Sequence, residues 1–355
     1  MNLQDLGFDN WFEQQADPLC NGEFTLARIT TVDRDQYTII SDIVTELPAK
    51  LAGHLMHTAA SPMNLPCVGD WVCVSYHDEN RYAIIHSLVP RKSYLRRKSP
   101  GKDIDFQMIA ANIDVAFIIQ SCHYDFNLRR LERYLVMVND GHITPVIILT
   151  KIDLISKLEL DQLINSIRSA GIQCNIIPIS NISNEGITDV SESMQAKKTY
   201  CLIGSSGVGK TTFINQFLDE NKLDTKSVSE TGEGRHTTVR RQLLILNQGS
   251  IVIDTPGMRE LGIMSSSESI DSSFSDIPTL ATQCRFKDCS HQNEPGCAII
   301  AAIKNGDLDE KHYLNFVKLK KESEFYDMSY SEKRKKDKEL GKFYRSVLKH
   351  KKNKK

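Results

Sequence analysis

A glycine-rich stretch in the middle of the chain has the residue types needed to bind the phosphates of a nucleotide. Residues 204–211 read Gly-Ser-Ser-Gly-Val-Gly-Lys-Thr, which fits the pattern GxxxxGK(S/T) in full. Glycines let the backbone curl until its N–H groups converge on phosphate oxygens at the positive end of a following helix. Lys210 is expected to reach the β- and γ-phosphates, and the hydroxyl of Thr211 to ligate Mg²⁺. The predicted phosphate-loop contacts are Gly204, Ser205, Ser206, Gly207, Val208, Gly209, Lys210, Thr211 and Thr212.

An acidic signal follows downstream, at the end of a predicted strand over 250–253. Asp254 and Gly257 form an Asp-x-x-Gly step there, in which the carboxylate can hold the magnesium shell and the glycine N–H can sense a γ-phosphate. Between the two motifs, residues 232–238 have the polar, glycine-rich composition of a mobile loop. A threonine in this loop would ligate Mg²⁺ only while a γ-phosphate is present. Thr237 and Thr238 both qualify, and we assign the role to Thr238.

The base-reading signal precedes the phosphate loop. Residues 150–153 (Thr-Lys-Ile-Asp) follow a predicted strand and match the pattern (N/T)KxD. In this motif the aspartate accepts two hydrogen bonds from guanine, whereas adenine would leave a buried carboxylate unpaired. Thr150 replaces the usual asparagine, which removes one amide contact. Ser180, in a second loop at 178–181, is placed to add contacts to the guanine oxygen, so the predicted base contacts are Thr150, Lys151, Ile152, Asp153 and Ser180.

Three cysteines and one histidine lie close together nearer the C-terminus, at Cys284, Cys289, His291 and Cys297. Three thiolates and one imidazole form a closed tetrahedral set that suits structural zinc. The tight spacing leaves no open coordination position, which argues against a catalytic metal. The other cysteines of the nine in the chain are scattered, so we expect reduced thiols rather than a disulfide framework.

Strand-like and helix-like stretches alternate between residues 106 and 265, which predicts an α/β fold with a parallel sheet covered by helices. Predicted strands at 114–120, 145–149, 174–179 and 200–203 alternate with predicted helices at 128–139, 160–169 and 211–218. The phosphate and base motifs then lie at strand ends, where open α/β sheets bind their ligands. Two further helices are predicted after the cysteine cluster, at 298–304 and 309–321.

Five short β-like runs occupy residues 21–90, at 24–30, 36–40, 50–56, 71–76 and 81–86. So many strands in so short a segment favour a small closed barrel of the OB type, a fold that often binds oligonucleotides. A β-domain used only for packing or protein contact is the alternative. Residues 1–20 are polar and acidic and are interpreted as a flexible lead-in, and the basic segment 91–105 as a linker.

The near-neutral charge of the chain hides a polarised distribution. The 355 residues include 44 Lys plus Arg and 45 Asp plus Glu, a net charge of −1, yet residues 331–355 alone carry +9 and leave −10 for the rest. A basic tail over 328–355 favours a polyanionic partner such as RNA, and a solvated terminus explains the charge equally well. No apolar run approaches the roughly 20 residues of a membrane span, and no secretory signal opens the chain. We therefore expect a cytoplasmic monomer without membrane contact.

The order of the motifs is the sharpest observation in the sequence. In Ras-like GTPases the phosphate loop comes first, whereas here residues 150–153 and Ser180 precede Gly204, and Asp254 comes last. This order resembles a circularly permuted GTPase. Together with the barrel and the zinc spacing, Gly-Arg-His-Thr-Thr at 234–238 and Asp-Thr-Pro-Gly at 254–257 resemble the RsgA family of ribosome small-subunit-dependent GTPases.

The resemblance implies an OB-fold RNA-binding barrel (21–90), a circularly permuted Ras-like P-loop GTPase domain (106–265) and a zinc-binding helical domain (266–327). It implies a late assembly factor that binds the small ribosomal subunit and its rRNA, and that hydrolyses GTP to GDP and phosphate when the subunit stimulates it. The implied cofactors are one structural Zn²⁺ per chain and Mg²⁺ with GTP. A factor in which GTP acts mainly as an affinity switch is the alternative. The guanine-type motif argues against a P-loop ATPase or kinase.

Met258 follows Gly257, at the position where Ras-like enzymes place a water-orienting glutamine. Methionine cannot orient water, so we expect slow intrinsic hydrolysis and activation by a group on the subunit. His236 is the candidate catalytic residue within the chain, to orient or deprotonate the attacking water. A switch-loop histidine that contacts RNA phosphate or simply packs is the alternative.

Overall fold

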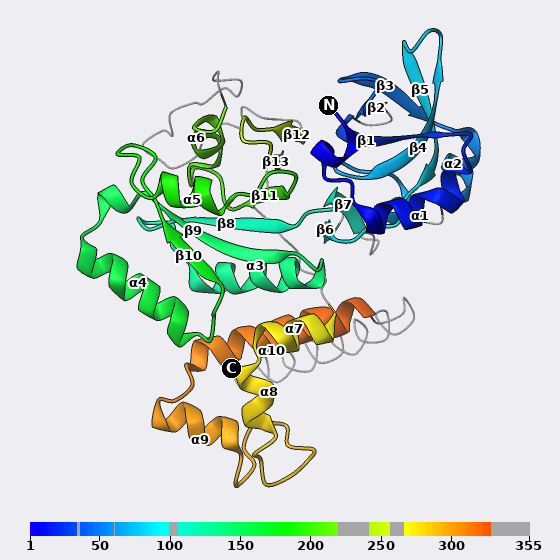
Figure 1. Cartoon of the computed structure of the whole chain (residues 1–355). Coiled ribbons are helices and arrows are strands. Elements are labelled where there is room, and N and C mark those ends of the chain that lie inside the picture. Colours follow the sequence, from blue (N-terminus) through cyan, green and yellow to red (C-terminus); the bar gives the residue numbers. More distant parts are fainter. Residues whose placement is uncertain (34–35, 60, 99–105, 219–240, 256–265, 328–355) are drawn as a thin grey trace, which may run out of the picture. The chain divides into compact units, whose positions relative to one another are not determined.

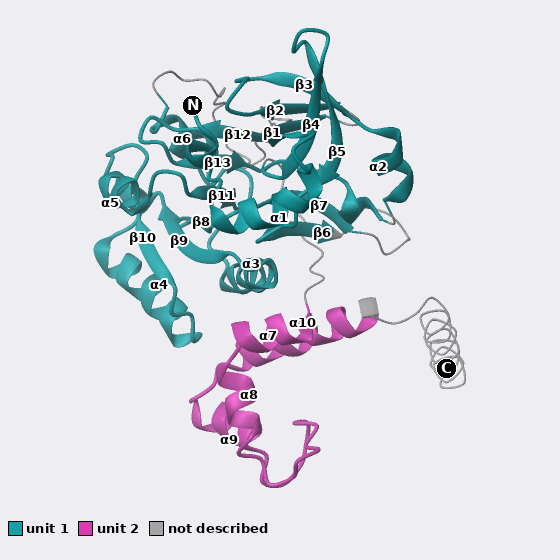
Figure 2. Cartoon of the chain, turned by 45° about the vertical axis from the view of Figure 1, so that its right-hand side comes forward, with its two compact units in different colours: residues 1–262 teal, residues 263–355 magenta. Residues whose placement is uncertain are grey.

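The computed structural model describes residues 1–33, 36–59, 61–98, 106–218, 241–255 and 266–327 (Figure 1). The chain divides into two compact units, residues 1–262 and 263–355 (Figure 2). Unit 1 holds the barrel and the parallel sheet, and unit 2 holds the cysteine cluster. Within the described ranges, no helix is both long and apolar enough to cross a membrane.

The part of unit 1 that carries the predicted phosphate and base motifs is built on a mostly parallel sheet. Among the described residues, the parallel strands lie in the spatial order β10, β9, β8, β11, β13. Their bounds are Asn175–Pro178 (β10), Thr144–Thr150 (β9), Val115–Ser121 (β8), Thr199–Ile203 (β11) and Ile251–Asp254 (β13). The strand β12 (Gln242–Ile245) runs antiparallel to β13. Because the other strands are parallel, their carboxyl ends meet at one edge, where the predicted motifs begin.

Helices cover both faces of this sheet (Figure 1). On one face lie α3 (Leu128–Asp140) and α4 (Lys157–Ser169), and on the other α5 (Ile187–Ser193) and α6 (Lys210–Asn215). The side chains of Phe213 and Ile214 on α6 belong to one core cluster with Phe117 of β8 and Leu202 of β11. The described part of residues 106–265 therefore has the predicted alternation of strands and helices.

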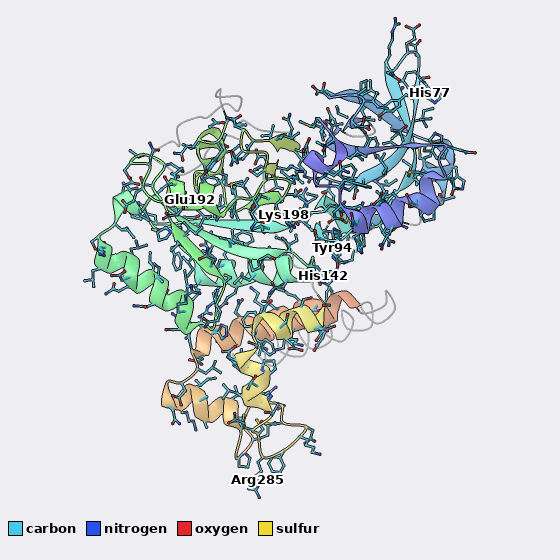
Figure 3. All side chains as sticks on the ribbon, in the orientation of Figure 1. His77, Tyr94, His142, Glu192, Lys198 and Arg285 are labelled. Atoms are coloured by element: carbon cyan, nitrogen blue, oxygen red, sulfur yellow. A yellow bond between two sulfur atoms is a disulfide. The ribbon has the colours of Figure 1, made fainter. Side chains whose placement is uncertain are left out.

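The N-terminal strands close a barrel with the strand number predicted for the OB type. The strands pair in the order β1 (Thr25–Asp33), β2 (Gln36–Ile40), β3 (Leu47–Leu51), β5 (Tyr82–Leu88) and β4 (Trp71–His77), and β4 returns to β1. His77 lies at the end of β4, close to the hairpin that leads to β5 (Figure 3). The strand predicted over 50–56 is wrong beyond Leu51, because Gly53–Thr58 forms the helix α2. Residues 51–57 contain no β-branched side chain that would favour a strand.

Residues 1–20 pack against the barrel and differ from the predicted flexible lead-in. They form a 3-10 helix, η1 (Leu3–Leu6), and the helix α1 (Asn10–Cys20), each with a side-chain N-cap. Leu6, Phe12 and Ala16 share one buried cluster with Trp71 of the barrel. The buried residues of α1, Phe12, Ala16 and Cys20, recur every fourth residue, which is the spacing of a buried helix face, and the interpretation as a lead-in overlooked this signal.

A disulfide also departs from the sequence expectation. Cys20, at the end of α1, is bonded to Cys73 of β4, so the prediction of reduced thiols is wrong for this pair. A partner 53 residues away leaves no local pattern in the sequence. Burial raises the pKa of Cys122 to about 12 and that of Cys174 to about 11. Neither thiol is therefore a ready nucleophile near neutral pH.

The first part of the predicted linker, residues 91–98, is ordered. Within it β6 (Tyr94–Lys98) pairs antiparallel with β7 (Phe106–Ala111) as a separate two-stranded sheet. Arg91 donates to the two carboxylate oxygens of Asp70 at 2.8 and 2.7 Å. Burial lowers the pKa of Arg91, but the hydrogen bond and the charge of Asp70 outweigh burial and raise it above its usual value. This ion pair fixes the chain as it leaves the barrel.

A single buried arginine joins the barrel to the parallel sheet. Arg28 of β1 is 1% exposed, and it donates to groups from four separate segments. One of them is the hydroxyl of Thr199, the first residue of the strand that leads to the phosphate loop. The neighbouring Lys198 lies between sheet and barrel (Figure 3). Burial lowers the pKa of Arg28 to about 10, and nearby carboxylates oppose that shift. The acceptors are the carbonyl oxygens of Leu6, Gly69 and Asn112 and the Oγ1 of Thr199.

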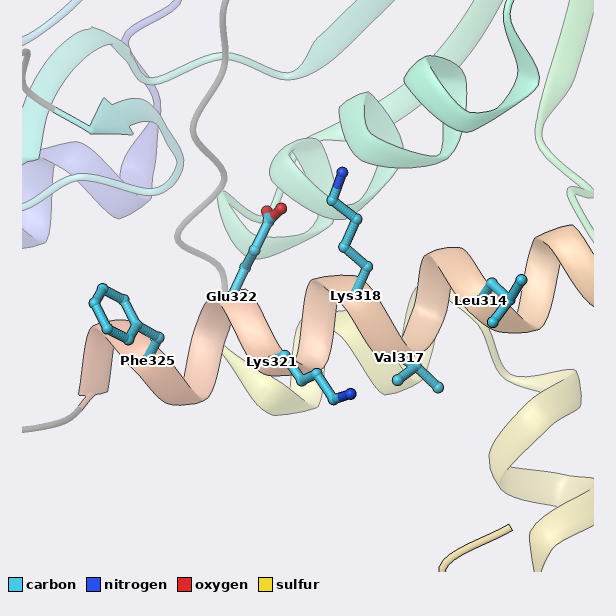
Figure 4. A pocket seen from close by; sticks show the side chains of 6 residues that line it. All are labelled: Leu314, Val317, Lys318, Lys321, Glu322 and Phe325. Carbon is cyan, nitrogen blue, oxygen red and sulfur yellow. The ribbon is translucent and has the colours of Figure 1, made fainter. Parts of the chain in front are cut away.

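Unit 2 is helical in its described residues, with α7 (Ser267–Ser273), α8 (Asp276–Ala281), α9 (Ala298–Asn305) and α10 (Glu310–Asp327). The helices α7 and α10 lie side by side (Figure 2), linked by the ammonium of Lys320, which donates to Asp271 at 2.6 Å. Another face of α10 carries a shallow groove, and Leu314 in it is 55% exposed. The groove is lined by Leu314, Val317, Lys318, Lys321, Glu322 and Phe325 (Figure 4).

The substitution Arg28→Ala is expected to lower the free energy of unfolding by about 3 kcal/mol or more, because it leaves buried acceptors unpaired and opens a cavity. Urea denaturation of the full chain measures this change. The matched control is Arg81→Ala, whose side chain is 73% exposed in an ion pair with Asp78. The control should change stability by less than about 0.5 kcal/mol. Equal effects of the two substitutions would contradict the role of Arg28.

Candidate functional site

The phosphate loop joins β11 to α6, and its glycines adopt conformations that other residues resist. Gly207 and Gly209 have positive φ angles of 79° and 97°, a region in which a side chain is strained. At Gly204, an added Cβ would lie 2.4 Å from the carbonyl oxygen of Ile119 in β8. Gly207 and Gly209 are therefore required by their backbone angles, and Gly204 by the close approach of β8. The loop can pass next to the end of that strand because Gly204 has no side chain.

Lys210, the first residue of α6, lies over the loop that precedes it. Its ammonium donates to the carbonyl oxygens of Gly204 and Ser205 at 2.7 and 2.6 Å. These contacts hold a positive charge at the end of the helix where backbone N–H groups already favour anions. Thr211 and Thr212 follow in the same helical turn. The arrangement suits a polyphosphate. When a polyphosphate binds, the ammonium of Lys210 would leave the two carbonyl oxygens and bind phosphate oxygens instead.

Asp254 ends β13, on the strand next to β11. It is in register with Leu202, and it is 3% exposed. Burial raises the pKa of its carboxyl group, and the positive charge of Lys210 opposes this shift. The hydroxyl of Thr255 donates to the carbonyl of Leu202 and fixes the end of the strand. A buried carboxylate close to the loop lysine can supply the oxygen ligand that a magnesium–phosphate site needs.

The base-reading motif meets the second predicted loop in space. The hydroxyl of buried Ser180 donates to Oδ1 of Asp153 at 2.6 Å. The same hydroxyl oxygen accepts the N–H groups of Ile182 and Ser183, so it is held in place by its own loop. A carboxylate has about four lone-pair sites, so Asp153 can still accept both guanine donors while this bond orients it. Two motifs 27 residues apart in the sequence thus come together, as the predicted base pocket requires.

Thr150 connects this base pocket to the phosphate loop. Its Oγ1 lies 2.7 Å from the carbonyl oxygen of Val208 and 3.3 Å from that of Gln120, and the shorter contact takes its one proton. Thr150 is fully buried, so an unpaired carbonyl at this point would cost stability. The amide contact expected to be lost here is therefore replaced by a hydroxyl contact. The next residues complete a tight turn, with Lys151 in a left-handed conformation (φ 63°) and Ile152 buried.

Two polar residues that the sequence did not single out also contact the phosphate loop. Asn181 Nδ2 lies 3.3 Å from the carbonyl oxygen of Gly209, and an added Cβ at Gly209 would approach that nitrogen to 2.7 Å. Asp125, in the loop after β8, accepts a hydrogen bond from the hydroxyl of Ser205 at 2.7 Å. Asn181 belongs to the predicted second loop at 178–181, although no contact is assigned to it there, and Asp125 belongs to no predicted motif. The one signal that could have found Asp125 is its position after a predicted strand.

Several predicted site residues lie outside the described part of the chain. They are the candidate catalytic residue His236, the candidate magnesium ligands Thr237 and Thr238, and Gly257 and Met258. The basic tail over 328–355 lies outside it as well. These assignments stay predictions.

The four predicted metal ligands come together between α8 and α9. The Sγ atoms of Cys284 and Cys297 are 4.0 Å apart, and they lie 3.5 and 3.4 Å from Nδ1 of His291. All four ligand atoms, including that of Cys289, lie within 4.8 Å of one another. Tetrahedral zinc with usual bond lengths separates its ligand atoms by about 3.5 to 3.8 Å. The cluster therefore fits a structural zinc site.

Backbone N–H groups support two of these sulfur atoms. Cys297 is the N-cap of α9, and its sulfur lies 3.5 Å from the N–H of Ile300. The sulfur of Cys284 lies 3.4 Å from the N–H of Ala298. Donors of this kind favour the thiolate, the form that binds a metal. The helix that follows the cluster thus helps to hold its ligands.

Thr150→Val is expected to weaken guanine-nucleotide binding about tenfold, because a buried hydrogen bond to the phosphate loop is lost while side-chain shape is kept. Thr150→Ser keeps the hydroxyl and should stay within about twofold of the original affinity. Calorimetric titration with GDP measures all three proteins. Equal affinities would show that the link between the two loops does not matter for binding.

Cys297→Ser is expected to abolish stoichiometric zinc binding and to unfold the helices of unit 2, because structural zinc supplies folding free energy to small domains. Atomic absorption and far-ultraviolet circular dichroism of the full chain measure the two effects. Cys174→Ser, at a half-buried thiol outside the cluster, is the control and should keep the metal. Full zinc content in the Cys297 variant would contradict the assignment.

Comparison with known proteins identifies one family. The family model described as RsgA GTPase matches residues 88–264. A protein of Listeria monocytogenes serotype 4b named small ribosomal subunit biogenesis GTPase RsgA 2 is 38% identical, over 92% of this chain and 90% of that protein. The protein of the same name from Lactiplantibacillus plantarum is 40% identical, over 87% of this chain and 86% of its own length.

Solved structures share the fold. The crystal structure of YjeQ from Thermotoga maritima matches with a TM-score of 0.62 at 24% identity, covering 84% of this chain and 98% of that one. The crystal structure of YloQ, described as a circularly permuted GTPase, matches with a TM-score of 0.58 at 22% identity, covering 86% and 97%. These matches, with the barrel and the zinc-type cluster, confirm the predicted fold class. The chain is a GTPase and belongs to the RsgA family.

Proposed function

We propose that this GTPase acts as a late maturation factor of the small ribosomal subunit, and that binding to the subunit and its rRNA stimulates its hydrolysis of GTP. The observation that carries the proposal is the extent of the likeness to relatives named for small-subunit biogenesis, which spans nearly the whole chain. It therefore includes the barrel and the zinc cluster as well as the GTPase sheet. An enzyme that only hydrolysed GTP would need neither of these flanking parts.

The nucleotide is proposed to lie along the edge formed by the strand ends. Asp153, oriented by Ser180, would accept the two guanine donors, and Lys210 would hold the phosphates. Mg²⁺, held by Thr211 and Asp254, would neutralise charge that develops on the phosphates. The burial of Asp254 near Lys210 supports this assignment. The hydroxyl of Thr150 would keep the base pocket and the phosphate loop at a fixed separation.

Hydrolysis is proposed to depend on the partner. Met258, in place of a water-orienting glutamine, supports slow turnover by the chain alone. His236 is proposed to orient or deprotonate the attacking water once the subunit has positioned it. Thr238 is proposed to add the remaining magnesium contact while GTP is bound.

RNA contact is proposed for the barrel and for the basic C-terminal segment. A five-stranded barrel of the OB type presents loops that commonly bind oligonucleotides. The +9 charge of residues 331–355 would add a salt-sensitive contact to phosphates. We propose that the protein works as a monomer in the cytoplasm, where the subunits assemble.

Single-turnover GTP hydrolysis with and without purified small subunits tests the proposal. Subunits are expected to raise the rate, and His236→Ala is expected to remove on the order of 10²- to 10⁴-fold of the stimulated rate, the usual contribution of a positioned acid–base group. An unchanged stimulated rate would eliminate the catalytic role of His236. GTP-dependent binding without stimulated turnover would favour the affinity-switch alternative over the proposed function.

A further inference from the structure

The loop between β8 and α3 holds an aromatic side chain far out in solvent. Tyr124 is 97% exposed, the largest exposed fraction among the large hydrophobic residues that the structure describes. Between residues 120 and 135 it is the one large hydrophobic residue that is exposed. Single exposed apolar side chains are common on protein surfaces, so the exposure of Tyr124 gains its meaning from its backbone and its neighbours.

The exposure of Tyr124 is imposed by a tight turn with a strained backbone. The N–H of Asp125 donates to the carbonyl of His123, which makes Tyr124 the centre of a three-residue turn. Its φ angle is +40°, a left-handed value that is rare for a bulky residue. Strain of this kind is kept where the surrounding structure enforces it, and it is common at functional sites.

Both ends of this loop are fixed. The N–H of His123 donates to the hydroxyl of Ser121 at 3.2 Å. The side chain of Gln120, which is fully buried, pairs with the backbone of Asn127 through contacts of 3.0 and 3.3 Å. Asn127 in turn caps the first turn of α3. Tyr124 therefore projects from a frame anchored on the sheet rather than from a loose loop.

The residue after Tyr124 contacts the phosphate loop. Asp125 accepts the hydroxyl of Ser205 at 2.7 Å, and Arg130 on α3 pairs with the same carboxylate at 2.9 Å. The carbonyl oxygen of Ser205 accepts the ammonium of Lys210 at 2.6 Å. A continuous path of contacts thus runs from the exposed Tyr124 through Asp125 and Ser205 to the lysine that is expected to hold the nucleotide phosphates.

The chemistry around Tyr124 favours an unpaired base of RNA as its partner. The ring of His123 lies 3.7 Å from that of Tyr124, centroid to centroid, so two aromatic rings project together. A protein hot spot needs a cluster of exposed apolar side chains around an anchor residue, whereas the neighbouring Phe126 is only partly exposed. Stacking on a base needs only an open aromatic face. Arg129 and Arg130 lie on the adjoining turn of α3, paired with Glu132 and Asp125 at 2.6 and 2.9 Å, and their planar guanidinium groups can also stack on bases.

We propose that Tyr124 docks on an unpaired rRNA base of the small subunit, and that Asp125 transmits this docking to Ser205 and Lys210 in the phosphate loop. The inference rests on the proposed function, because it needs the subunit as partner, and it names a route by which the subunit reaches the nucleotide site. Stacking on Tyr124 would shift the strained turn and move the carboxylate of Asp125. Because Asp125 is bonded to the hydroxyl of Ser205, this movement would change the hydrogen bond between the Ser205 carbonyl and the ammonium of Lys210.

The test is a titration of small subunits into single-turnover GTP hydrolysis by the full chain. Tyr124→Ala is expected to raise the subunit concentration for half-maximal stimulation about tenfold, the usual effect of losing one stacked base. Tyr124→Phe and Tyr124→Trp keep a stacking face and should stay within about twofold of the original chain. Tyr124→Leu keeps apolar area without the face and should behave like the alanine variant.

A second arm separates docking from transmission. Ser205→Ala breaks the contact with Asp125, so its ratio of stimulated to intrinsic rate should fall about fivefold, while the half-maximal subunit concentration stays the same. The matched control is Leu158→Ala, which removes a side chain on α4 that is 68% exposed. It should change neither quantity. Intrinsic hydrolysis and GTP affinity of Tyr124→Ala should equal those of the original chain.

The outcomes distinguish the two proposals. If subunits fail to stimulate the original chain, the proposed function fails. If they stimulate it and Tyr124→Ala responds like the original chain, the inference about Tyr124 is overturned and the proposed function stands. If Tyr124→Leu behaves like the original chain, the partner of this side chain is an apolar protein pocket rather than an RNA base. This result would also overturn the inference.

Discussion

The hydrogen bond between Thr150 and the carbonyl of Val208 is the contact on which the nucleotide site depends. It joins a base-reading motif and a phosphate loop that come from different strand ends and lie 58 residues apart. In the proposed function one motif reads the base and the other holds the phosphates, so a nucleotide needs both. Their separation must match the length of one nucleotide. The hydroxyl is buried between parallel strands, and we propose that it sets this separation whichever motif comes first in the chain.

The sequence could predict the parts of the site that depend on neighbouring residues, and not the parts that depend on contacts between distant segments. Some site residues are recognised from the few residues around them, because their roles depend on local backbone conformation or on short spacing. They are Gly204, Lys210, Asp153 and the cysteine cluster. The strands and helices of the sheet follow from hydrophobic period for the same reason. Burial of residues 1–20 and the pairing of Cys20 with a cysteine 53 residues away depend on surfaces that meet only after folding. A short window can show that α1 has an apolar face, but it cannot show which surface covers that face or which cysteine pairs with Cys20.

Arg28 couples the position of the barrel to that of the GTPase sheet. Its guanidinium is satisfied only when the 3-10 helix η1, a barrel loop, the residue after β7 and the strand β11 are all in place. The strand pairing of β1 with β12, through Thr31 and Gln242, adds a second connection. A buried charge tolerates little displacement of its partners, because each lost acceptor costs free energy. A partner that binds the barrel would therefore act on the strands that carry the phosphate loop and the proposed magnesium ligand.

The loop at Tyr124 shows how a carboxylate can lie beside a phosphate site without opposing it. Asp125 close to a polyphosphate would weaken binding by like-charge repulsion if it stood alone. Arg130 pairs with it at 2.9 Å, so the pair can hold Ser205 with little net charge. The nucleotide contacts themselves are local and visible in the sequence. The residues that would tune them act across space from a neighbouring strand end, which is where a partner can reach them without entering the site.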